Sequence, residues 1–394
     1  MKCLYFTYDG LLDPLGQSQV LPYLFRLIAA GHSFTIISYE KVERSIASVQ
    51  ELESRLKTVG VQWRRLPFKR GRLEAIKRLF TGIASLRDVC RPGRFEMVHL
   101  RGLMPAVIYR LSLRRIPHLY DFRGFALEEW TDFGKIRAGS IPYRILKQID
   151  RRSVETACGL VVLEKPAEVL LRKTYRVRNI PLKVIRTSTD VERYRPRPDS
   201  LANFADSILF VCLGGARRPY RPDMALKFVR QVLNCGIDCR LDFLNEHDHE
   251  EIKAAIKSED FPEDRVRILG VDHPEVPAIL REYDCGLVFC DSSPWRRVCS
   301  PTKLGEYLAA GLPVVSMDGI DVLDEFASST DCVRIVTAAE LTGKVDRDRL
   351  DRLISFIRQP GAASACRQLA CQEFSLDRAG KLYASLYEEI AETL

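Results

Sequence analysis

The stretch SPTKLGEYLAAGLPVV, residues 300–315, opens with residue types that suit a phosphate site. We expect Ser300 as the N-cap of a helix and Pro301 as its first residue. The backbone N–H groups of Thr302 and Lys303 then have no intrahelical partner. Lys303 adds a full charge to the positive end of the helix dipole, which is mildly unfavourable unless an anion binds there. This helix end is therefore a candidate phosphate site.

The next turn of this helix places a carboxylate among small residues. Gly305 inside a helix costs about 1 kcal/mol relative to alanine, which indicates close approach by another group. Glu306 is placed to accept two hydrogen bonds, as from the vicinal hydroxyls of a ribose. The alternative is a capped surface helix whose Lys303 and Glu306 are solvated or paired with each other.

A second cationic loop, LGGARRPYRPD, covers residues 213–223 and follows a strand-like run. Its paired glycines allow close backbone approach, and the guanidinium groups of Arg217, Arg218 and Arg221 suit phosphate oxygens. Seen alone, such a loop is more often an ordinary turn with surface arginines. Because both loops follow strands of the same half of the chain, a shared diphosphate is favoured.

The loop YDGLLDPLGQSQVLPYL, residues 8–24, is long for a strand-to-helix turn. Gly16 and Gln17 lie just before a predicted helix, where the loop is able to cover a polar ligand. Neither this loop nor any other matches the GxGxxG or Walker fingerprints, which argues against a redox dinucleotide or a P-loop nucleotide.

Polar residues also end two other predicted strands of the first half, VHLRG and YDFRG. They place His99, Arg101, Asp121 and Arg123 at the rim of a sheet. A structural alternative stays open, because a lone histidine after a strand is more often a satisfied core residue, and Asp121 could pair with Arg123 in a turn.

Buried parallel strands must position these loops. The chain has 394 residues, 46% hydrophobic and 28% charged, as in a soluble globular enzyme of two or three domains. Continuous apolar runs alternate with helical patterns, which predicts an α/β fold with parallel sheets. We expect one doubly wound domain over residues 1–190 and another over 205–375, joined by a polar linker at 186–204. A helix at 376–394, with Leu382, Leu386 and Ile390 at four-residue spacing, is expected to pack back towards the first domain.

The net charge of +8 is unevenly distributed. Residues 64–94 contain ten basic side chains and two acids, and Leu73, Ile76 and Phe80 recur there at helical spacing. We favour a helix packed on the core with a solvated cationic face. Attraction to an anionic membrane surface is the main alternative.

The remaining composition argues against several classes of protein. There is no signal-like segment and no apolar run of about 18 residues, so we expect neither export nor a membrane span. The twelve cysteines are scattered without a CxxC pair, which indicates reduced thiols in the cytoplasm and no structural metal. The basic region lacks a groove-reading motif, which argues against nucleic-acid binding.

The helix stretch at 300–315 resembles the signature of family 4 retaining glycosyltransferases, which have the GT-B fold. Three other segments agree: the residue 8–24 loop with the following GHSFTIISYEK, DFRGFALEEW, and VDHPEVPAIL. The resemblance spans nearly the whole chain. It implies two Rossmann-like domains facing a central cleft that binds a nucleotide sugar.

The resemblance also implies roles for individual residues. Glu306 matches the glutamate that holds the donor ribose, and Gly270 with Val271 match the loop that receives the nucleobase. The remaining donor-site matches are Ser300, Thr302 and Lys303 at the diphosphate and Arg221 at a phosphate-binding lysine, with Arg217 or Arg218 replacing an arginine whose own position is Gly215.

Two positions depart from the family pattern. The glutamate that contacts the donor sugar falls at Val298, and the second histidine of a His-x-His strand end is Arg101. Both departures concern the sugar, so they leave the donor's identity open.

The resemblance implies sugar transfer with retention from a UDP- or GDP-linked donor, without a metal or another cofactor. Arg101, Asp121 and Arg123 are the catalytic candidates, and Gly16 and Gln17 belong to the acceptor or phosphate loop. The expected acceptor is a glycan or polyprenyl-linked precursor, met in the cytoplasm or at the inner face of the plasma membrane. The alternatives are a nucleotide-sugar epimerase of the same fold and a catalytically degenerate subunit that binds a partner transferase.

Overall fold

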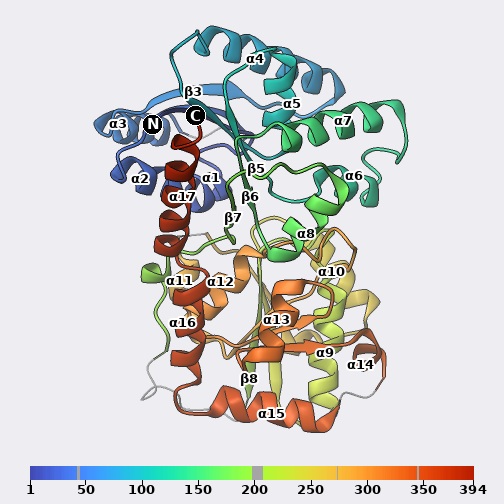
Figure 1. Ribbon diagram of the computed structural model, residues 1–394. Coiled ribbons are helices and arrows are strands. Elements are labelled where there is room, and N and C mark those ends of the chain that lie inside the picture. The colour runs from blue at the N-terminus through green and yellow to red at the C-terminus, as the bar shows by residue number, and fades with distance from the viewer. Residues whose placement is uncertain (42–44, 198–206, 273, 344–345) are drawn as a thin grey trace. The chain divides into compact units, whose positions relative to one another are not determined.

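The computed structural model describes residues 1–41, 45–197, 207–272, 274–343 and 346–394, without the Arg72 side chain (Figure 1). The chain forms two compact units. We call Met1–Arg186 with Leu376–Leu394 the N-terminal unit, and Thr187–Ser375 the C-terminal unit. Both are α/β, so the predicted fold class is confirmed. The expected domain start at residue 205 lies outside the described residues.

The described part of the N-terminal unit is built on a seven-stranded parallel sheet with the order β3-β2-β1-β4-β5-β6-β7. Its central strands are continuous apolar runs, and all five side chains of β4 are buried. The strands are β1 (Lys2–Thr7), β2 (Ser33–Glu40), β3 (Gln62–Pro67), β4 (Met97–Arg101), β5 (His118–Asp121), β6 (Gly159–Val162) and β7 (Leu182–Val184).

Helices cover both faces of this sheet. Right-handed crossovers place α2 and α3 on one face, where α17 packs against α2. They place α4, α5 and α7 on the other face, with α5 in contact with both of its neighbours. The helices are α1 (Pro14–Gln19), α2 (Leu21–Ala29), α3 (Ile46–Thr58), α4 (Arg72–Val89), α5 (Leu103–Leu111), α6 (Ala126–Asp132), α7 (Ile141–Glu155), α8 (Lys165–Thr174) and α17 (Leu376–Ala391).

In its described residues, the C-terminal unit repeats this plan with a six-stranded parallel sheet, β10-β9-β8-β11-β12-β13. One core lies under α9, α10 and α15, and a second lies under α12, α13 and α16. The strands are β8 (Ile208–Leu213), β9 (Cys239–Leu244), β10 (Val266–Leu269), β11 (Cys285–Val288), β12 (Val314–Met317) and β13 (Val333–Val336). The helices are α9 (Pro222–Asn234), α10 (His249–Ser258), α11 (Val276–Ile279), α12 (Thr302–Ala309), α13 (Asp321–Ser329), α14 (Ala338–Thr342), α15 (Arg347–Arg358) and α16 (Ala362–Glu373).

The segment predicted as a linker, 186–204, is partly core. Val191 and Tyr194 are buried in the second core of the C-terminal unit. Val191 is the first residue of a short 3₁₀ helix, Val191–Arg193, and Tyr194 follows it. Burial of these two side chains outweighs the polar composition that suggested a linker. Residues 198–204 lie outside the described residues.

The predicted core packing of the basic helix holds for only half of α4. Leu86 and Val89 in its second half are buried, whereas Leu73, Ile76 and Phe80 are 75%, 54% and 65% exposed. The apolar stripe therefore faces solvent over the first part of the helix. In the part of the chain that is described, no helix is long and apolar enough to cross a bilayer.

Candidate functional site

The helix that carries Lys303 begins one residue later than expected. Helix α12 starts at Thr302 with Pro301 as its N-cap, and no side chain caps it. Ser300 is buried instead, and its Oγ accepts a hydrogen bond from the Thr187 backbone N–H over 3.3 Å. The prediction of Ser300 as N-cap is wrong, because Thr187 occupies its hydroxyl. Because no side chain caps α12, its first backbone N–H groups, those of Thr302 and Lys303, have no acceptor from a cap or from within the helix.

Lys303 lies against the loop that follows β8. Its Nζ is 3.8 Å from the centroid of the Tyr220 ring, a cation–π arrangement. Gly214 has a φ of +85°, and a Cβ there would lie 3.9 Å from the same Nζ. Among the described residues, no carboxylate oxygen lies within 4.0 Å of this ammonium group. Within the described residues, the ammonium group of Lys303 therefore faces an aromatic ring and no carboxylate.

Lys303 and Arg221 line the same small cavity at the carboxyl end of β8. It is lined by Cys212, Leu213, Gly214, Gly215, Ala216, Tyr220, Arg221, Pro222, Phe243, Leu287, Phe289 and Lys303. The structure thus brings together one residue from each of the two cationic loops that the sequence indicated. The location agrees with the rule that ligands of parallel sheets bind at the carboxyl ends of strands.

The other two arginines of the loop are engaged elsewhere. Arg217 pairs with Glu251 over 2.6 Å and with Asp248 over 3.1 Å, and Arg218 pairs with Asp291 over 3.1 Å. Both side chains are exposed, and neither is among the residues that line the Lys303 cavity. A role at a diphosphate for either would require it to leave its carboxylate.

Arg221 is held at the cavity by two carboxylates. It pairs with Asp223 over 2.6 Å and with Asp291 over 3.0 Å. The hydrogen bond with Asp223 is the main cause that raises the pKa of Arg221. Its guanidinium group is therefore fixed in direction but partly neutralised.

Asn245 is a site residue that the sequence analysis missed. Its Nδ2 donates to the Gly214 carbonyl over 2.8 Å, and its Oδ1 accepts the Asp248 N–H over 2.5 Å. Asn245 thereby ties the loop after β9 to the loop after β8. The available signal was its position directly after an apolar strand, which is where the other site residues were found.

Glu306 is buried to 7% exposure in the second turn of α12. Its Oε1 accepts the Tyr194 hydroxyl over 3.1 Å. Burial and the neighbouring carboxylate raise the pKa of Tyr194, which keeps the phenol a donor. Beside it, a Cβ on Gly305 would lie 2.6 Å from Thr189 Oγ1, so the close approach predicted at this glycine is made by the chain itself.

The remaining donor-site candidates differ in exposure. Thr302 and Val271 are partly exposed, and a Cβ on Gly270 would meet nothing within 4 Å, so the loop after β10 borders open space. Val298 is 2% exposed and belongs to the core. Its side chain supports the fold at the position where the family pattern has a glutamate.

In the N-terminal unit, the three catalytic candidates meet around one carboxylate. Arg101 Nη1 donates to Asp121 Oδ2 over 3.1 Å, and the Tyr383 hydroxyl of α17 donates to the same oxygen over 3.0 Å. Arg123 Nη1 lies 3.5 Å from Asp121 Oδ1, and His99 Nε2 lies 3.6 Å from Oδ2. We call these five residues the Asp121 cluster. Tyr383 was missed, since nothing in its helical spacing indicates a polar partner.

Electrostatics keep this cluster charged although it is buried. Burial opposes ionisation of Asp121, but Arg123, His99 and Arg101 lower the pKa of its carboxyl well below the usual range. Burial lowers the pKa of His99, which favours the neutral imidazole. Asp121 is 0% exposed and therefore orients the arginines rather than meeting a ligand. Arg123 Nη1 has no hydrogen-bond acceptor among the described residues, so it retains a donor.

Gly16 and Gln17 hold the loop after β1 in place. Gly16 is buried, and any Cβ there would clash with the Gly10 carbonyl. Gln17 Nε2 donates to the Leu11 carbonyl over 2.6 Å. Glu40, at the end of β2, accepts the Leu11 N–H over 3.0 Å. The loop is thus a rigid turn, and its glycine and glutamine shape it.

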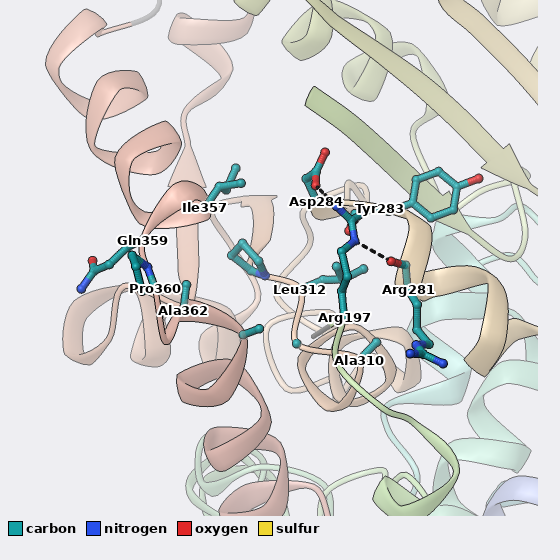
Figure 2. Close-up of a pocket in the computed structure, with 13 residues that line it drawn as sticks. Arg197, Arg281, Tyr283, Asp284, Ala310, Leu312, Ile357, Gln359, Pro360 and Ala362 are labelled. Carbon is teal, nitrogen blue, oxygen red and sulfur yellow. Dashed lines mark hydrogen bonds and ion pairs between the residues drawn. The ribbon is translucent and has the colours of Figure 1, made fainter. Parts of the chain in front are cut away.

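A further pocket of the C-terminal unit lies at the opposite edge of the sheet (Figure 2). It borders Asp284 and Pro313, which precede β11 and β12. Arg197 crosses it and donates to the Arg281 carbonyl over 2.9 Å and to Asp284 over 3.3 Å, as the dashed lines show. These contacts give Arg197 a structural role at the amino ends of the strands.

A metal ion bound by a protein needs several ligating side chains that lie close together. In the described ranges, no three His, Cys, Asp or Glu side chains are grouped so as to hold a metal ion.

Comparisons with known proteins give structural likenesses only. No protein-family model and no curated protein matches the chain. Sucrose-phosphate synthase from Thermosynechococcus elongatus is similar, with 12% identity, 100% of both chains covered and a TM-score of 0.73. TarM matches with 8% identity, 98% of both chains covered and a TM-score of 0.72. A putative UDP-N-acetylglucosamine 2-epimerase from Listeria monocytogenes matches with 12% identity, 100% of this chain and 97% of that chain covered, and a TM-score of 0.60.

These likenesses span the whole chain at 8% to 12% identity, and they agree with the two parallel-sheet units described above. The chain therefore has the fold of the GT-B glycosyltransferases, with two Rossmann-like units.

Proposed function

We propose that the protein transfers a sugar from a nucleotide-diphosphate sugar to a glycan or lipid-linked acceptor. The observation that carries the proposal is Lys303, which lies at the uncapped start of α12 and shares a cavity with Arg221. No carboxylate of the described chain lies within 4.0 Å of its ammonium group. A diphosphate supplies the charge that this site lacks. The fold shared with sucrose-phosphate synthase and with a structure named as a UDP-N-acetylglucosamine 2-epimerase supports a nucleotide-sugar enzyme.

The donor is proposed to contact successive parts of the C-terminal unit. Its diphosphate binds Lys303, Arg221 and the first N–H groups of α12. Its ribose hydroxyls donate to Glu306, whose carboxylate Tyr194 already orients over 3.1 Å. Its base lies at the open loop around Val271. UDP- and GDP-linked donors both fit this arrangement of contacts.

We propose transfer with retention. The acceptor hydroxyl oxygen forms a bond to the anomeric carbon while the bond from that carbon to the diphosphate oxygen breaks on the same face of the sugar. The departing diphosphate oxygen takes the acceptor proton, so no protein base is needed. Lys303 and Arg221 stabilise the negative charge that develops on the leaving group.

The Asp121 cluster is proposed to serve the acceptor. Arg123, whose side chain is 16% exposed, contacts the acceptor through its exposed atoms, and Asp121 and Arg101 position it. Gly16 and Gln17 hold the adjacent loop after β1. A polyprenyl-linked acceptor keeps its lipid in a bilayer, so the enzyme must then work at a membrane face.

Calorimetric titration with UDP, GDP and ADP tests the donor site, followed by assay of donor hydrolysis and the anomeric configuration of the product. We expect one diphosphate to bind, its sugar donor to hydrolyse slowly, and the product to retain the donor configuration. Glu306→Gln should reduce the preference for that diphosphate over its 2′-deoxy form. Absence of all nucleotide binding would point to a degenerate subunit, for which Val298 and Arg101 are the sequence indications.

An epimerase is the second candidate, because a structure described as a UDP-N-acetylglucosamine 2-epimerase has the same fold. Epimerisation at C2 breaks a C–H bond, so it exchanges that hydrogen with solvent. Incubating the donor with the enzyme in deuterated water distinguishes the two activities. Deuterium at C2 would support the epimerase, and its absence with sugar transfer would support the transferase.

A further inference from the structure

Two helices of the N-terminal unit expose large apolar side chains. On α4, Leu73, Ile76 and Phe80 are 75%, 54% and 65% exposed, at helical spacing. On α7, Ile141 and Ile145, one turn apart, are 75% and 55% exposed. Large apolar groups gathered in this way mark an interaction surface, because water contact is unfavourable for each of them.

The two stripes belong to the same face and the same edge of the unit. Helices α4, α5 and α7 form one layer, with α5 in contact with both neighbours (Figure 1). Helices that connect parallel strands begin at the carboxyl edge of the sheet, so both α4 and α7 start there. The Asp121 cluster lies at the same edge, since Arg101 and Asp121 end β4 and β5.

Exposed cationic side chains flank both stripes. Around the start of α4 they are Lys69, Arg70 and Lys77, and before and within the start of α7 they are Lys135, Arg137 and Arg144. Lys77 pairs with Glu74 over 2.7 Å, and Asp132, the last residue of α6, is an exposed acid. The surroundings of the apolar stripes are therefore mainly positive.

We infer that these stripes and their flanking cations, here called the α4–α7 surface, bind an anionic lipid bilayer. Apolar side chains enter the boundary between headgroups and acyl chains, while lysines and arginines contact anionic headgroups, as in interfacial amphipathic helices. The charge complementarity favours lipid over a second copy of this chain, whose matching surface would be equally positive. The bilayer would then lie at the edge that carries the Asp121 cluster.

Co-sedimentation of the full chain with vesicles tests this. We compare phosphatidylcholine vesicles with vesicles that also contain phosphatidylglycerol, at low and high salt. Binding should require phosphatidylglycerol and weaken at high salt. Leu73→Ser combined with Phe80→Ser should weaken binding by about tenfold or more, because each loses apolar contact. Lys69→Glu combined with Arg70→Glu should weaken it by about tenfold.

The matched control is Ile46→Ser on α3, because Ile46 is 77% exposed but lies on the opposite face of the sheet. It should leave vesicle binding unchanged. Thermal unfolding of each variant without vesicles should match that of the parent, since these side chains are exposed.

Any of the following vesicle results would overturn the inference: equal binding to neutral and anionic vesicles, loss of binding with Ile46→Ser, or no change with the double variant Leu73→Ser and Phe80→Ser. A dimer that the double serine variant abolishes, without vesicle binding by the parent, would identify a second copy as the occupant and also overturn it. Vesicle binding needs no nucleotide, so its failure is separate from failure of the titrations that test the donor site.

Discussion

At the carboxyl edges of the two sheets, the charges of Asp121 and Lys303 differ in whether neighbouring groups of opposite charge compensate them. In the N-terminal unit, Asp121 is fully buried, and Arg101 and Arg123 compensate it within 3.1 Å and 3.5 Å. In the C-terminal unit, Lys303 lies on the Tyr220 ring without a carboxylate in reach among the described residues. Self-compensated charges hold a fold together, whereas an uncompensated cation leaves binding energy for an anionic ligand. The contrast is therefore between a buried charge that its neighbours compensate and a cation that no carboxylate of the described residues compensates.

Removing the central carboxylate should have the largest effect. Asp121→Asn leaves Arg123 without its paired carboxylate and leaves Arg101 with Asp9 alone, which should lower the free energy of unfolding by about 3–5 kcal/mol. Urea unfolding monitored by hydrogen exchange in β4 and β5 measures this for the N-terminal unit.

The matched control is Asp291→Asn in the C-terminal unit. Asp291 also pairs with two arginines, but its side chain is 22% exposed. Its loss should cost about 1 kcal/mol or less. Equal losses for the two variants would remove the contrast between the units.

Acid should destabilise the N-terminal unit through a second buried group, His118. Its Nε2 donates to the Ser153 carbonyl over 2.9 Å, and burial lowers its pKa from 6.5 to about 4. The unfolded chain binds the proton first, so stability should fall by roughly 3 kcal/mol as the pH drops from about 6.5 to about 4. His118→Gln should flatten this dependence in unfolding measurements. An unchanged slope would show that other groups cause it.

Lys303→Ala should separate binding from stability. It should weaken binding of the preferred nucleoside diphosphate by about 10- to 100-fold in calorimetric titration, because a charge-assisted contact is lost. Unfolding should change by less than about 0.5 kcal/mol. Lys253→Ala is the control, since Lys253 is exposed and pairs with Glu250 over 2.9 Å. Equal affinity of both variants would contradict the donor-site assignment.

The smallest expected effect concerns one hydroxyl. Tyr383→Phe removes a donor to Asp121 Oδ2 and should cost about 1–2 kcal/mol of unfolding free energy. Tyr220→Phe keeps the ring beneath Lys303, and the Tyr220 hydroxyl makes no hydrogen bond within the described residues, so this variant should cost less than about 0.5 kcal/mol. Thermal unfolding of the two variants side by side makes the comparison. Equal shifts in the unfolding temperature of the two variants would mean that the Tyr383 hydrogen bond to Asp121 does not stabilise the fold.

Much of the fold could be predicted from the sequence because buried parallel strands are continuous apolar runs. The same runs located the strand ends near which Lys303, Arg221 and Asp121 lie, since ligands of parallel sheets bind at those ends. Local rules sufficed for these features.

Partners across the fold could not be predicted in this way. Arg217 and Arg218 are alternatives for a phosphate contact, and the sequence did not show that Arg217 pairs with Asp248 and Glu251, which helix α10 and the residue before it bring close. Gly305 correctly indicated a close approach, yet its spacing did not reveal Thr189 as the approaching group. Such pairings depend on tertiary packing, which short-range patterns do not encode.

Helix α17 is synthesised last but is part of the N-terminal unit, so this unit cannot complete its folding until the whole chain has been made. It contributes Tyr383 to the Asp121 cluster and belongs to the unit that the first 186 residues form. On a ribosome, that unit must wait until residues 187–375 have been made, which takes roughly 10–40 s at about 5–20 residues per second. The C-terminal unit, encoded later, is complete first. A nascent N-terminal unit therefore spends this interval with an apolar surface uncovered, and chaperones have most reason to act on it then.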